Sequence, residues 1–347
     1  MVYFIASDSK KLTKFLKEIN AYFKYVISLL ISLGCVLNGQ LVWGQTTPQN
    51  YPNKTVKIIV PFAPGGPTDV QGRWAAEQLS QALGQAFIVE NQGGAGGVPA
   101  TDRVVKSVPD GYTLLAGNPG PLVVAPAIRG QMPYNTMTDL EPIMLIARSA
   151  SCVAVHPSVP ARNVKEFIAY AKANPGKINY GSPGIGTIGH LGMERFTFQA
   201  GIVLNHVPYK GAAQYLNDLL AGHIQVAFIQ FSPCIQQIKQ GKLFSLGATS
   251  EKRSSLLPDM PTIAEQGLSG YASYNWNGLL APKGTPAPII NRLYEILSTQ
   301  LATKENQDLF INQGHEPGNL TPEGYRKFLQ AELNKNAELA KAANIKE

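Results

Sequence analysis

Short apolar runs alternate with amphipathic stretches along most of the chain. Each run is bounded by glycine, proline or polar residues, and its length suits a strand that is buried on both faces. This alternation is typical of an α/β fold with mostly parallel sheets flanked by helices. The predicted strands are Thr55–Val60, Ala86–Glu90, Thr113–Ala116, Ile143–Ala147, Cys152–His156, Lys177–Tyr180, Val203–His206, Ile224–Ile229 and Phe244–Ala248.

The amphipathic stretches carry signals for where helices begin and end. Between the first two predicted strands, apolar residues recur near helical spacing from Val70 to Leu83, and Gly84 closes that helix. Asn163 is a typical N-cap for a second helix, and a third opens at Pro286. In folds of this kind, ligands bind at the loops that join strands to helices.

The length of 347 residues suggests two domains, yet no long linker or low-complexity segment separates them. The chain is then expected to cross between the domains more than once. Glu141–Ser149 and Tyr271–Ala281 are apolar, extended stretches that suit such crossings. We therefore predict a discontinuous first domain, residues 45–145 and 276–347, a second domain, residues 146–275, and a ligand cleft between them.

The first 44 residues differ in character from the rest. Five lysines precede the apolar run Val26–Leu37, which is too short to span a bilayer comfortably but suits the core of a signal peptide. Small or modest residues then precede Gln45. We predict a signal peptide over residues 1–44, cleavage at Gln45, and export. The alternatives are an uncleaved N-terminal anchor and, on weaker grounds, lipid attachment at Cys35.

The leader also inflates the formal net charge of +7. Leaving out its five lysines, Asp8 and Glu18 lowers 30 basic and 23 acidic residues to 25 and 21, a net charge of +4. This charge is mild and forms no Lys/Arg stripe, so we expect no nucleic-acid partner.

Neither the cysteines and histidines nor the sequence motifs indicate a metal site, a cofactor or an enzyme. Beyond the leader only Cys152 and Cys234 remain, outside any C-x-x-C pair, and the five histidines show no metal-ligand spacing. An exported protein can form a disulfide between these cysteines, but we prefer to interpret them as two small buried hydrophobes. The G-x-S-x-G and H-E-x-x-H motifs are missing. We expect a protein that is not an enzyme, without catalytic residues, metal or cofactor.

The Gly/Pro-rich loop Pro61–Asp69 is the strongest local candidate for binding. It follows a predicted parallel strand and opens a helix, so its glycines and the unpaired N–H groups of the helix start favour an anion. Thr68 or Asp69 can cap the helix, and for Asp69 capping is preferred over ligand contact. The candidate residues of this loop are Phe62, Ala63, Pro64, Gly65, Gly66, Thr68 and Asp69.

A second glycine-rich loop, Gly181–His190, has the same position between a strand and a helix. It contains a G-x-G-x-x-G match, but the next predicted strand, Val203–His206, ends without an acidic residue to hold a ribose. We interpret the loop as a second anion cradle and keep a nucleotide-binding α/β enzyme as the alternative. Its candidate residues are Ser182, Gly184, Gly186, Thr187 and His190, of which His190 is equally well explained by packing or capping.

Weaker candidates follow other predicted strands. Gln230 and Asn118 stand at positions where a side chain faces the cleft, and Gln230 is included in the predicted ligand-binding set. Tyr209 and Lys210 also follow a strand, although Lys210 is equally well explained as a solvated loop charge.

Taken in order, short segments spread over the whole mature chain resemble one family, the periplasmic substrate-binding proteins of tripartite tricarboxylate transporters, also called Bug proteins. Each segment is short, but the ordered series is highly specific. The segments are Pro61–Asp69 with Arg73, Asn91–Gly97, Asp110–Leu114, Pro133-Tyr134 with Asp139-Leu140, Gly181–Gly184, Val207–Gly211, Pro258–Thr262, Trp276–Gly278 and Ala281–Pro286.

The resemblance implies a two-domain clamshell like that of periplasmic binding proteins, which closes on its ligand. It implies that Phe62–Asp69 and Ser182–Thr187, one loop from each domain, grip one carboxylate partly through ordered waters. It further implies a monomer in the periplasm whose partners are a small organic carboxylate and integral membrane transporter subunits. Gln230 and the segment Gly117–Pro126 depart from the family pattern where the far end of the ligand lies. The sequence therefore leaves open which carboxylate binds, and whether the protein serves transport or is a ligand-sensing adaptor for a membrane signalling protein.

Overall fold

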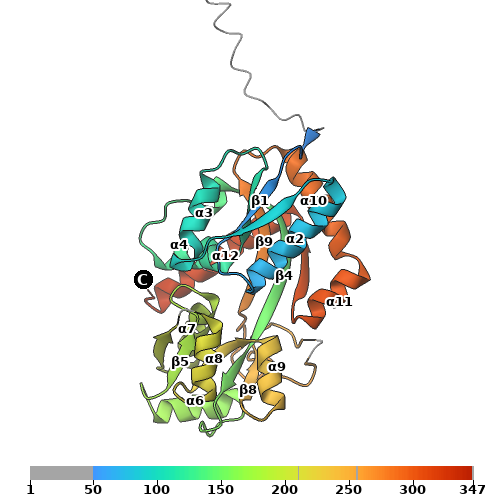
Figure 1. Ribbon diagram of the computed structural model, residues 1–347. Coiled ribbons are helices and arrows are strands. Elements are labelled where there is room, and N and C mark those ends of the chain that lie inside the picture. The colour runs from blue at the N-terminus through green and yellow to red at the C-terminus, as the bar shows by residue number, and fades with distance from the viewer. Residues whose placement is uncertain (1–49, 210, 255–256, 346–347) are drawn as a thin grey trace, which may run out of the picture. The chain divides into compact units, whose positions relative to one another are not determined.

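Strands and helices alternate along the chain as the hydrophobic pattern predicts, which confirms the α/β fold class (Figure 1). The computed structural model describes residues 50–347 except 210, 255–256 and 346–347. The predicted signal peptide over residues 1–44 and its cleavage at Gln45 lie outside the described residues. The strands are β1 Val56–Val60, β2 Phe87–Asn91, β3 Thr113–Gly117, β4 Leu140–Val155, β5 Asn179–Ser182, β6 Asn205–Pro208, β7 Val226–Gln230, β8 Phe244–Ala248, β9 Tyr274–Pro282 and β10 Glu316–Leu320.

Several helices begin and end at the residues that the sequence marks. Gly84, with φ of 65°, ends the first long helix in the left-handed conformation. The side chain of Asn163 caps a later helix by accepting a hydrogen bond from the N–H of Glu166 at 2.9 Å. The helices are α2 Pro67–Leu83, α3 Val98–Val105, α4 Ala125–Ile128, α5 Thr136–Asp139, α6 Val164–Ala173, α7 Ile188–Ala200, α8 Ala212–Leu220, α9 Phe231–Lys239, α10 Ala287–Leu301, α11 Lys304–Asn312 and α12 Pro322–Ala342, with a 3-10 turn at Ala95–Gly97 and a π-helical turn at Gly120–Val124.

The strands form a continuous mixed sheet. Their order is β2-β1-β3-β9-β4-β7-β5-β6, and β8 and β10 also pair with β4. Strand β1 is parallel to β2 and β3, and β5 is parallel to β6 and β7. The pairs that involve β4 and β9 are antiparallel. The predicted parallel pairing therefore holds for three strands toward each end of the order, and antiparallel strands connect the two groups.

Strand β4 is one long strand, whereas the sequence pattern predicts two, Ile143–Ala147 and Cys152–His156; that prediction is wrong. Polar residues at Arg148, Ser149 and Ser151 interrupt the apolar run and look like a break. Because β4 pairs with β9 as far as Ala150 and with β7 from Ser151, its backbone stays hydrogen-bonded across the polar positions.

The two predicted crossings, Glu141–Ser149 and Tyr271–Ala281, coincide largely with β4 and β9. These strands pair from Leu140 opposite Pro282 to Ala150 opposite Tyr274. Figure 1 shows β4 running from the neighbourhood of α2 and α12 to that of α8 and α9.

Buried apolar side chains separate into groups by their position in the chain. Two clusters draw on residues 51–147 and 276–345, with Leu191 as the one exception, and two others draw on residues 150–274. The domain boundaries at 45–145, 146–275 and 276–347 stay a prediction.

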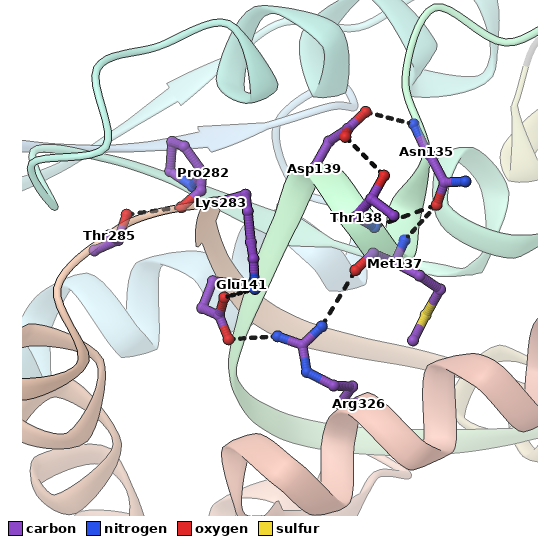
Figure 2. A network of polar contacts seen from close by, with 9 residues as sticks. All are labelled: Asn135, Met137, Thr138, Asp139, Glu141, Pro282, Lys283, Thr285 and Arg326. Atoms are coloured by element: carbon purple, nitrogen blue, oxygen red, sulfur yellow. Dashed lines mark hydrogen bonds and ion pairs between the residues drawn. The ribbon is translucent and has the colours of Figure 1, made fainter.

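A polar network fixes α12 against the beginning of β4 (Figure 2). The carboxylate of Glu141 accepts from Lys283 Nζ at 2.8 Å and pairs with the guanidinium of Arg326. Arg326 also donates to the carbonyl oxygen of Met137 at 3.2 Å. The carboxylate and guanidinium are each 25% exposed, so this pair is better shielded from water than a typical surface ion pair.

We expect Glu141→Gln to lower the free energy of unfolding by about 1 kcal/mol, because it removes the charge that both cations face. Equilibrium unfolding in urea measures this difference. The control is Glu323→Gln, which removes an exposed partner 3.5 Å from Lys327 and should change stability by less than about 0.5 kcal/mol. Equal losses in the two variants would contradict the role given to the network.

Cys152 of β4 and Cys234 of α9 form a disulfide, with their Cα atoms 6.6 Å apart. Two separate buried thiols, the interpretation preferred from the sequence, are therefore wrong. Both residues are fully buried, as small hydrophobes would be. The sequence could not predict the disulfide from the apolar surroundings of the two cysteines, because β4 and α9 come together only in the folded protein.

In the part of the chain that the structure describes, we find no helix with the length and apolar character needed to cross a membrane.

Candidate functional site

A cavity of about 380 Å³ opens where the loops after several strands converge. Its volume lies within the range of sites for small organic ligands. Among the described residues none of those lining it carries a charged side chain. They are Phe62, Ala63, Pro64, Gly66, Pro67, Thr68, Gly96, Asn118, Gly120, Ser151, Pro183, Gly186, Thr187, Ile188, Gly189, Gly211, Ala212, Tyr215, Phe228, Gln230 and Asn275.

Four helices begin at this cavity. Each contributes its N-cap or first residues to the lining: Gly66 and Pro67 for α2, Thr187 and Ile188 for α7, Gly211 and Ala212 for α8, and Gln230 for α9. The first N–H groups of a helix have no acceptor within the helix, and the aligned peptide dipoles add a partial positive charge there. The cavity is therefore suited to an anion although no described cationic side chain lines it.

Asp69 holds the first loop in shape from inside the protein. Its carboxylate accepts from the N–H of Gly65 at 2.9 Å, from Arg73 Nε at 3.0 Å and from Asn91 Nδ2 at 2.9 Å. The N-cap of α2 is Gly66, and no side chain caps it. The prediction that Thr68 or Asp69 caps this helix is therefore wrong. Asp69 stands in the first turn, and its side chain reaches back to the loop instead.

Protonation of Asp69 should loosen this loop. Burial pushes the pKa of Asp69 upward, but hydrogen bonds from Arg73, Gly65 and Asn91, with the charge of Arg73, outweigh burial and hold the pKa below its usual 3.8. Because the folded pKa is lowered, the ionised carboxylate stabilises the fold at neutral pH, and this contribution is lost as pH falls below about 4.

We expect Asp69→Asn to be less stable than the natural protein at pH 7, and the difference to shrink toward pH 3. Urea unfolding at both pH values measures it. Asp308→Asn provides a matched control, since Asp308 pairs at 2.7 Å with Lys304 on an exposed helix face. A constant difference for Asp69→Asn across this range would show that the carboxylate is not the stabilising group.

Thr68 links α2 to β9 and to Asn118, which directly follows β3. Its hydroxyl donates to Asn277 Oδ1 at 2.7 Å and accepts from Asn118 Nδ2 at 3.3 Å. Asn118 in turn accepts from the N–H of Gly120 at 3.0 Å. The hydroxyl is thus engaged in the protein, which leaves the backbone and the cavity-facing surface of Thr68 for a ligand.

The second loop is held by its own hydroxyl groups. Ser182 is fully buried and contacts His206 Nε2 at 2.7 Å, and its Oγ accepts from the N–H of Gly184 at 3.2 Å. Thr187 donates to the carbonyl oxygen of Gly184 at 2.7 Å and caps α7 by accepting from the N–H of His190 at 3.4 Å. Ser182 and Gly184 thus position the loop, and Gly186 and Thr187 line the cavity.

His190 is a packed histidine behind the loop. Its ring is stacked on that of His206 with centroids 4.3 Å apart, and His206 is stacked on Tyr180 at 4.7 Å. Burial lowers the pKa of His190 to about 4, and burial followed by the proximity of His190 lowers the pKa of His206 to about 4. Both rings are therefore neutral at neutral pH and add no positive charge near the cavity.

Eight of the thirteen predicted ligand-binding residues line the cavity: Phe62, Ala63, Pro64, Gly66, Thr68, Gly186, Thr187 and Gln230. The other five do not line it: Gly65, Asp69, Ser182, Gly184 and His190. Of the weaker candidates, Asn118 lines the cavity, Tyr209 instead donates to Asp218 at 2.6 Å, and Lys210 lies outside the described residues. A ligand contact for each lining residue stays a prediction.

Sequence reasoning missed the side chains that long-range pairing brings to the cavity. Ser151 lies opposite Gln230 where β4 and β7 pair, and Asn275 lies on β9 opposite Ser149. Tyr215 and Phe228 add aromatic surface. The available signal for Ser151 is a polar residue inside the apolar run of β4, a position that falls between the two strands predicted there.

Comparison with known proteins places the chain in a family. Residues 72–345 match the family described as tripartite tricarboxylate transporter family receptor, TctC. The chain belongs to the TctC receptor family. The predicted Bug-family resemblance is thereby confirmed: the chain is 32% identical over 319 residues to Protein BugT of Bordetella pertussis, strain Tohama I, which covers 92% of this chain and 98% of BugT.

Solved structures of TctC-like proteins have the same fold. The protein Rpa4515 of R. palustris, solved with adipate, is 33% identical with a TM-score of 0.79 and covers 85% of this chain and 99% of its own. The periplasmic binding protein BugD is 36% identical with a TM-score of 0.75, with the same two coverages. This chain thus has the fold of solute-binding receptors, one of which has been solved with a dicarboxylate.

Proposed function

We propose that this TctC receptor is a periplasmic solute-binding protein that captures a small organic carboxylate and delivers it to a tripartite membrane transporter. The observation that carries the proposal is the cavity, where four helix N-termini converge and no described lining residue is charged. Uncharged donors and helix dipoles stabilise a carboxylate without an arginine or lysine. The adipate found in Rpa4515 supports the ligand class.

Recognition would use both glycine-rich loops. The loop before α2 offers Gly66 and Thr68, and the loop before α7 offers Gly186 and Thr187. Bound water can bridge a carboxylate oxygen to either loop at little enthalpic loss. Since the two loops belong to different predicted domains, a ligand that contacts both favours the conformation in which the domains are close, and the transporter can recognise that conformation.

A ligand screen tests the carboxylate assignment. Melting temperatures of the mature protein are measured with mono-, di- and tricarboxylates, and adipamide serves as the uncharged match to adipate. At a concentration of about 100 times Kd, a true ligand stabilises the fold by about 2.7 kcal/mol. Adipamide should stabilise less than the best acid. The carboxylate proposal is lost if no acid raises the melting temperature, or if adipamide matches the best of them.

Two further measurements test the receptor role. Cell fractionation should recover a chain that begins at Gln45 in the periplasm. A bound acid should be released chemically unchanged after prolonged incubation, because a receptor returns its ligand intact. Conversion of the acid would instead indicate an enzyme, and recovery only in the membrane fraction would indicate an anchored protein.

A further inference from the structure

A second, smaller cavity of about 60 Å³ lies between α7, α12 and the segment that leads into β9. Helix α7 contributes Arg195, α12 contributes Lys335 and Asn336, the segment contributes Ala272, and β9 itself contributes Trp276. One water-sized group needs roughly 10–15 Å³ when volume is measured this way, so the cavity has room for a small ion with several atoms.

Two cations meet at this cavity. Arg195 Nη1 donates to the carbonyl oxygen of Ala272 at 3.0 Å, and Lys335 Nζ donates to the same oxygen at 3.5 Å. The two positive groups therefore lie side by side, although they come from α7 and α12. Two positive groups that share one acceptor oxygen repel each other, and partial burial strengthens the repulsion.

The protein neutralises these cations only in part. Glu332 lies 3.9 Å from Lys335 at its nearest oxygen, and Glu251 also lines the cavity. Within the described part of the chain, Arg195 has no carboxylate oxygen within ion-pair distance. Arg148, the third cation of the lining, pairs with Glu316 at 3.5 Å. Arg195 is therefore partly buried with no described carboxylate in direct contact, and the charge of Glu332 compensates it only from a longer distance.

Burial makes the charged forms of Arg195 and Lys335 less favourable. It lowers the pKa of Arg195, and burial followed by the charge of Arg195 lowers the pKa of Lys335. An anion between them would relieve the repulsion and stabilise both charged forms.

Trp276 lines the same cavity. The indole N–H of Trp276 is buried without a hydrogen-bond partner, and the residue is 0% exposed. Leaving a buried donor unpaired costs about 1–3 kcal/mol. A small displacement of the indole toward an oxyanion in the cavity would give this N–H an acceptor and offset the cost.

We propose that this second cavity binds a small inorganic oxyanion, such as phosphate or sulfate, between Arg195 of α7 and Lys335 of α12. The planar guanidinium presents two parallel N–H donors to such an ion, and the ammonium supplies a point charge. This site is separate from the carboxylate cavity and does not depend on the function proposed for that cavity.

The oxyanion site is also coupled to the first cavity through α7. Ile188, the first residue of α7, lines both cavities, and Arg195 lies on the same helix. Gly192 of α7 lies so close to Phe228, which lines the first cavity, that a Cβ there would stand 2.3 Å from its ring. An oxyanion that fixes α7 against α12 should therefore raise carboxylate affinity. This coupling, unlike the site itself, rests on the proposed function.

Phosphate titration of the mature protein tests the site. Calorimetry at constant ionic strength, with chloride as the balancing anion, should show saturable binding of one phosphate. In the Trp74→Phe variant Trp276 is the single tryptophan of residues 45–347, and its emission should change over the same concentrations. Absence of both signals would overturn the proposal.

Matched substitutions locate the site. We expect Arg195→Gln and Lys335→Gln to weaken phosphate binding at least 10-fold each, and Lys335→Arg to restore most of it. Lys327→Gln on the same helix should bind as the natural protein does, since Lys327 is 77% exposed and pairs with Glu323. Equal binding in Arg195→Gln, Lys335→Gln and Lys327→Gln would place the ion elsewhere and overturn the proposal.

A final measurement tests the coupling. The Kd of the best carboxylate should fall several-fold when phosphate saturates its site, and the Kd of phosphate should fall by the same factor when the carboxylate is bound. If phosphate binds but leaves the Kd of the carboxylate unchanged, the link through α7 is overturned. If no carboxylate binds at all, the proposed function fails while the phosphate titration still decides the second site.

Discussion

Replacing Gly186 by leucine is expected to weaken carboxylate binding at least about 100-fold, equivalent to about 2.7 kcal/mol of binding free energy. Gly186 lines the cavity and has φ of 76°, a conformation that costs an L-residue roughly 1–2 kcal/mol. A Cβ at this position lies 3.5 Å from Ile128 Cδ1 of α4, so a longer side chain is crowded against α4 or fills the cavity. The backbone strain and the crowding both displace the N–H groups at the start of α7.

The matched control for this substitution is Gly201→Leu. Gly201 follows the other end of α7, has φ of 60° and has no atom within 4 Å of a built Cβ. It carries the same backbone strain without touching the cavity. Calorimetric Kd values should therefore change for Gly186→Leu alone, and circular dichroism should show both variants folded. If Gly186→Leu keeps its affinity, the loop Gly181–His190 does not bind the carboxylate.

Removing the Cys152–Cys234 disulfide should lower the free energy of unfolding by about 4 kcal/mol. The bond joins residues 82 positions apart, so it restricts a large part of the unfolded chain. It also fixes α9 to β4 close to Ser151 and Gln230, which line the cavity of about 380 Å³. Urea unfolding of the variant with Cys152→Ala and Cys234→Ala, compared with the oxidised natural protein, measures the loss.

Reduction of the natural protein should reproduce the same loss, which separates the bond from the two substitutions. A thiol titration of the unfolded, unreduced mature protein should find no free cysteine. Two free thiols, or a stability difference below about 1 kcal/mol, would contradict a structural disulfide.

Local signals allowed much of the fold to be predicted. The strand Phe244–Ala248 has the predicted bounds, and Gly84 and Asn163 stand at the helix ends that they mark in the sequence. These features depend on residues close in the chain. The start of β5 and of β6 falls two residues later than predicted, because pairing with neighbouring strands decides where a strand begins.

Long-range features could not be predicted in the same way. The unbroken β4 depends on its pairing with β7, β8 and β9. Several helices and strands separate β4 from each of these strands in the chain. The disulfide depends on α9 packing against β4. Both require a tertiary arrangement that hydrophobic periodicity does not encode.

The residues of the candidate site likewise fall into those that local patterns predict and those that only long-range pairing brings to the cavity. Gly66 and Gly186 were predicted because a glycine-rich loop between a strand and a helix is a local pattern with a physical use. Ser151 and Asn275 were missed because only strand register brings them to the cavity. Asp69 was assigned to the right loop, but its role was wrong, since Arg73 and Asn91 draw its carboxylate inward.

Four helix N-termini surround the cavity of about 380 Å³, and none of its described lining residues carries a charge, which affects how such a receptor can diverge. Peptide N–H groups are supplied by nearly every amino acid, so point mutations seldom remove them. Substitutions at Tyr215, Phe228, Gln230 or Asn275 can then reshape the space around the rest of the acid while affinity for its charge persists. A duplicated copy of this gene would thus be free to acquire a new organic acid without first losing the ability to hold an anion.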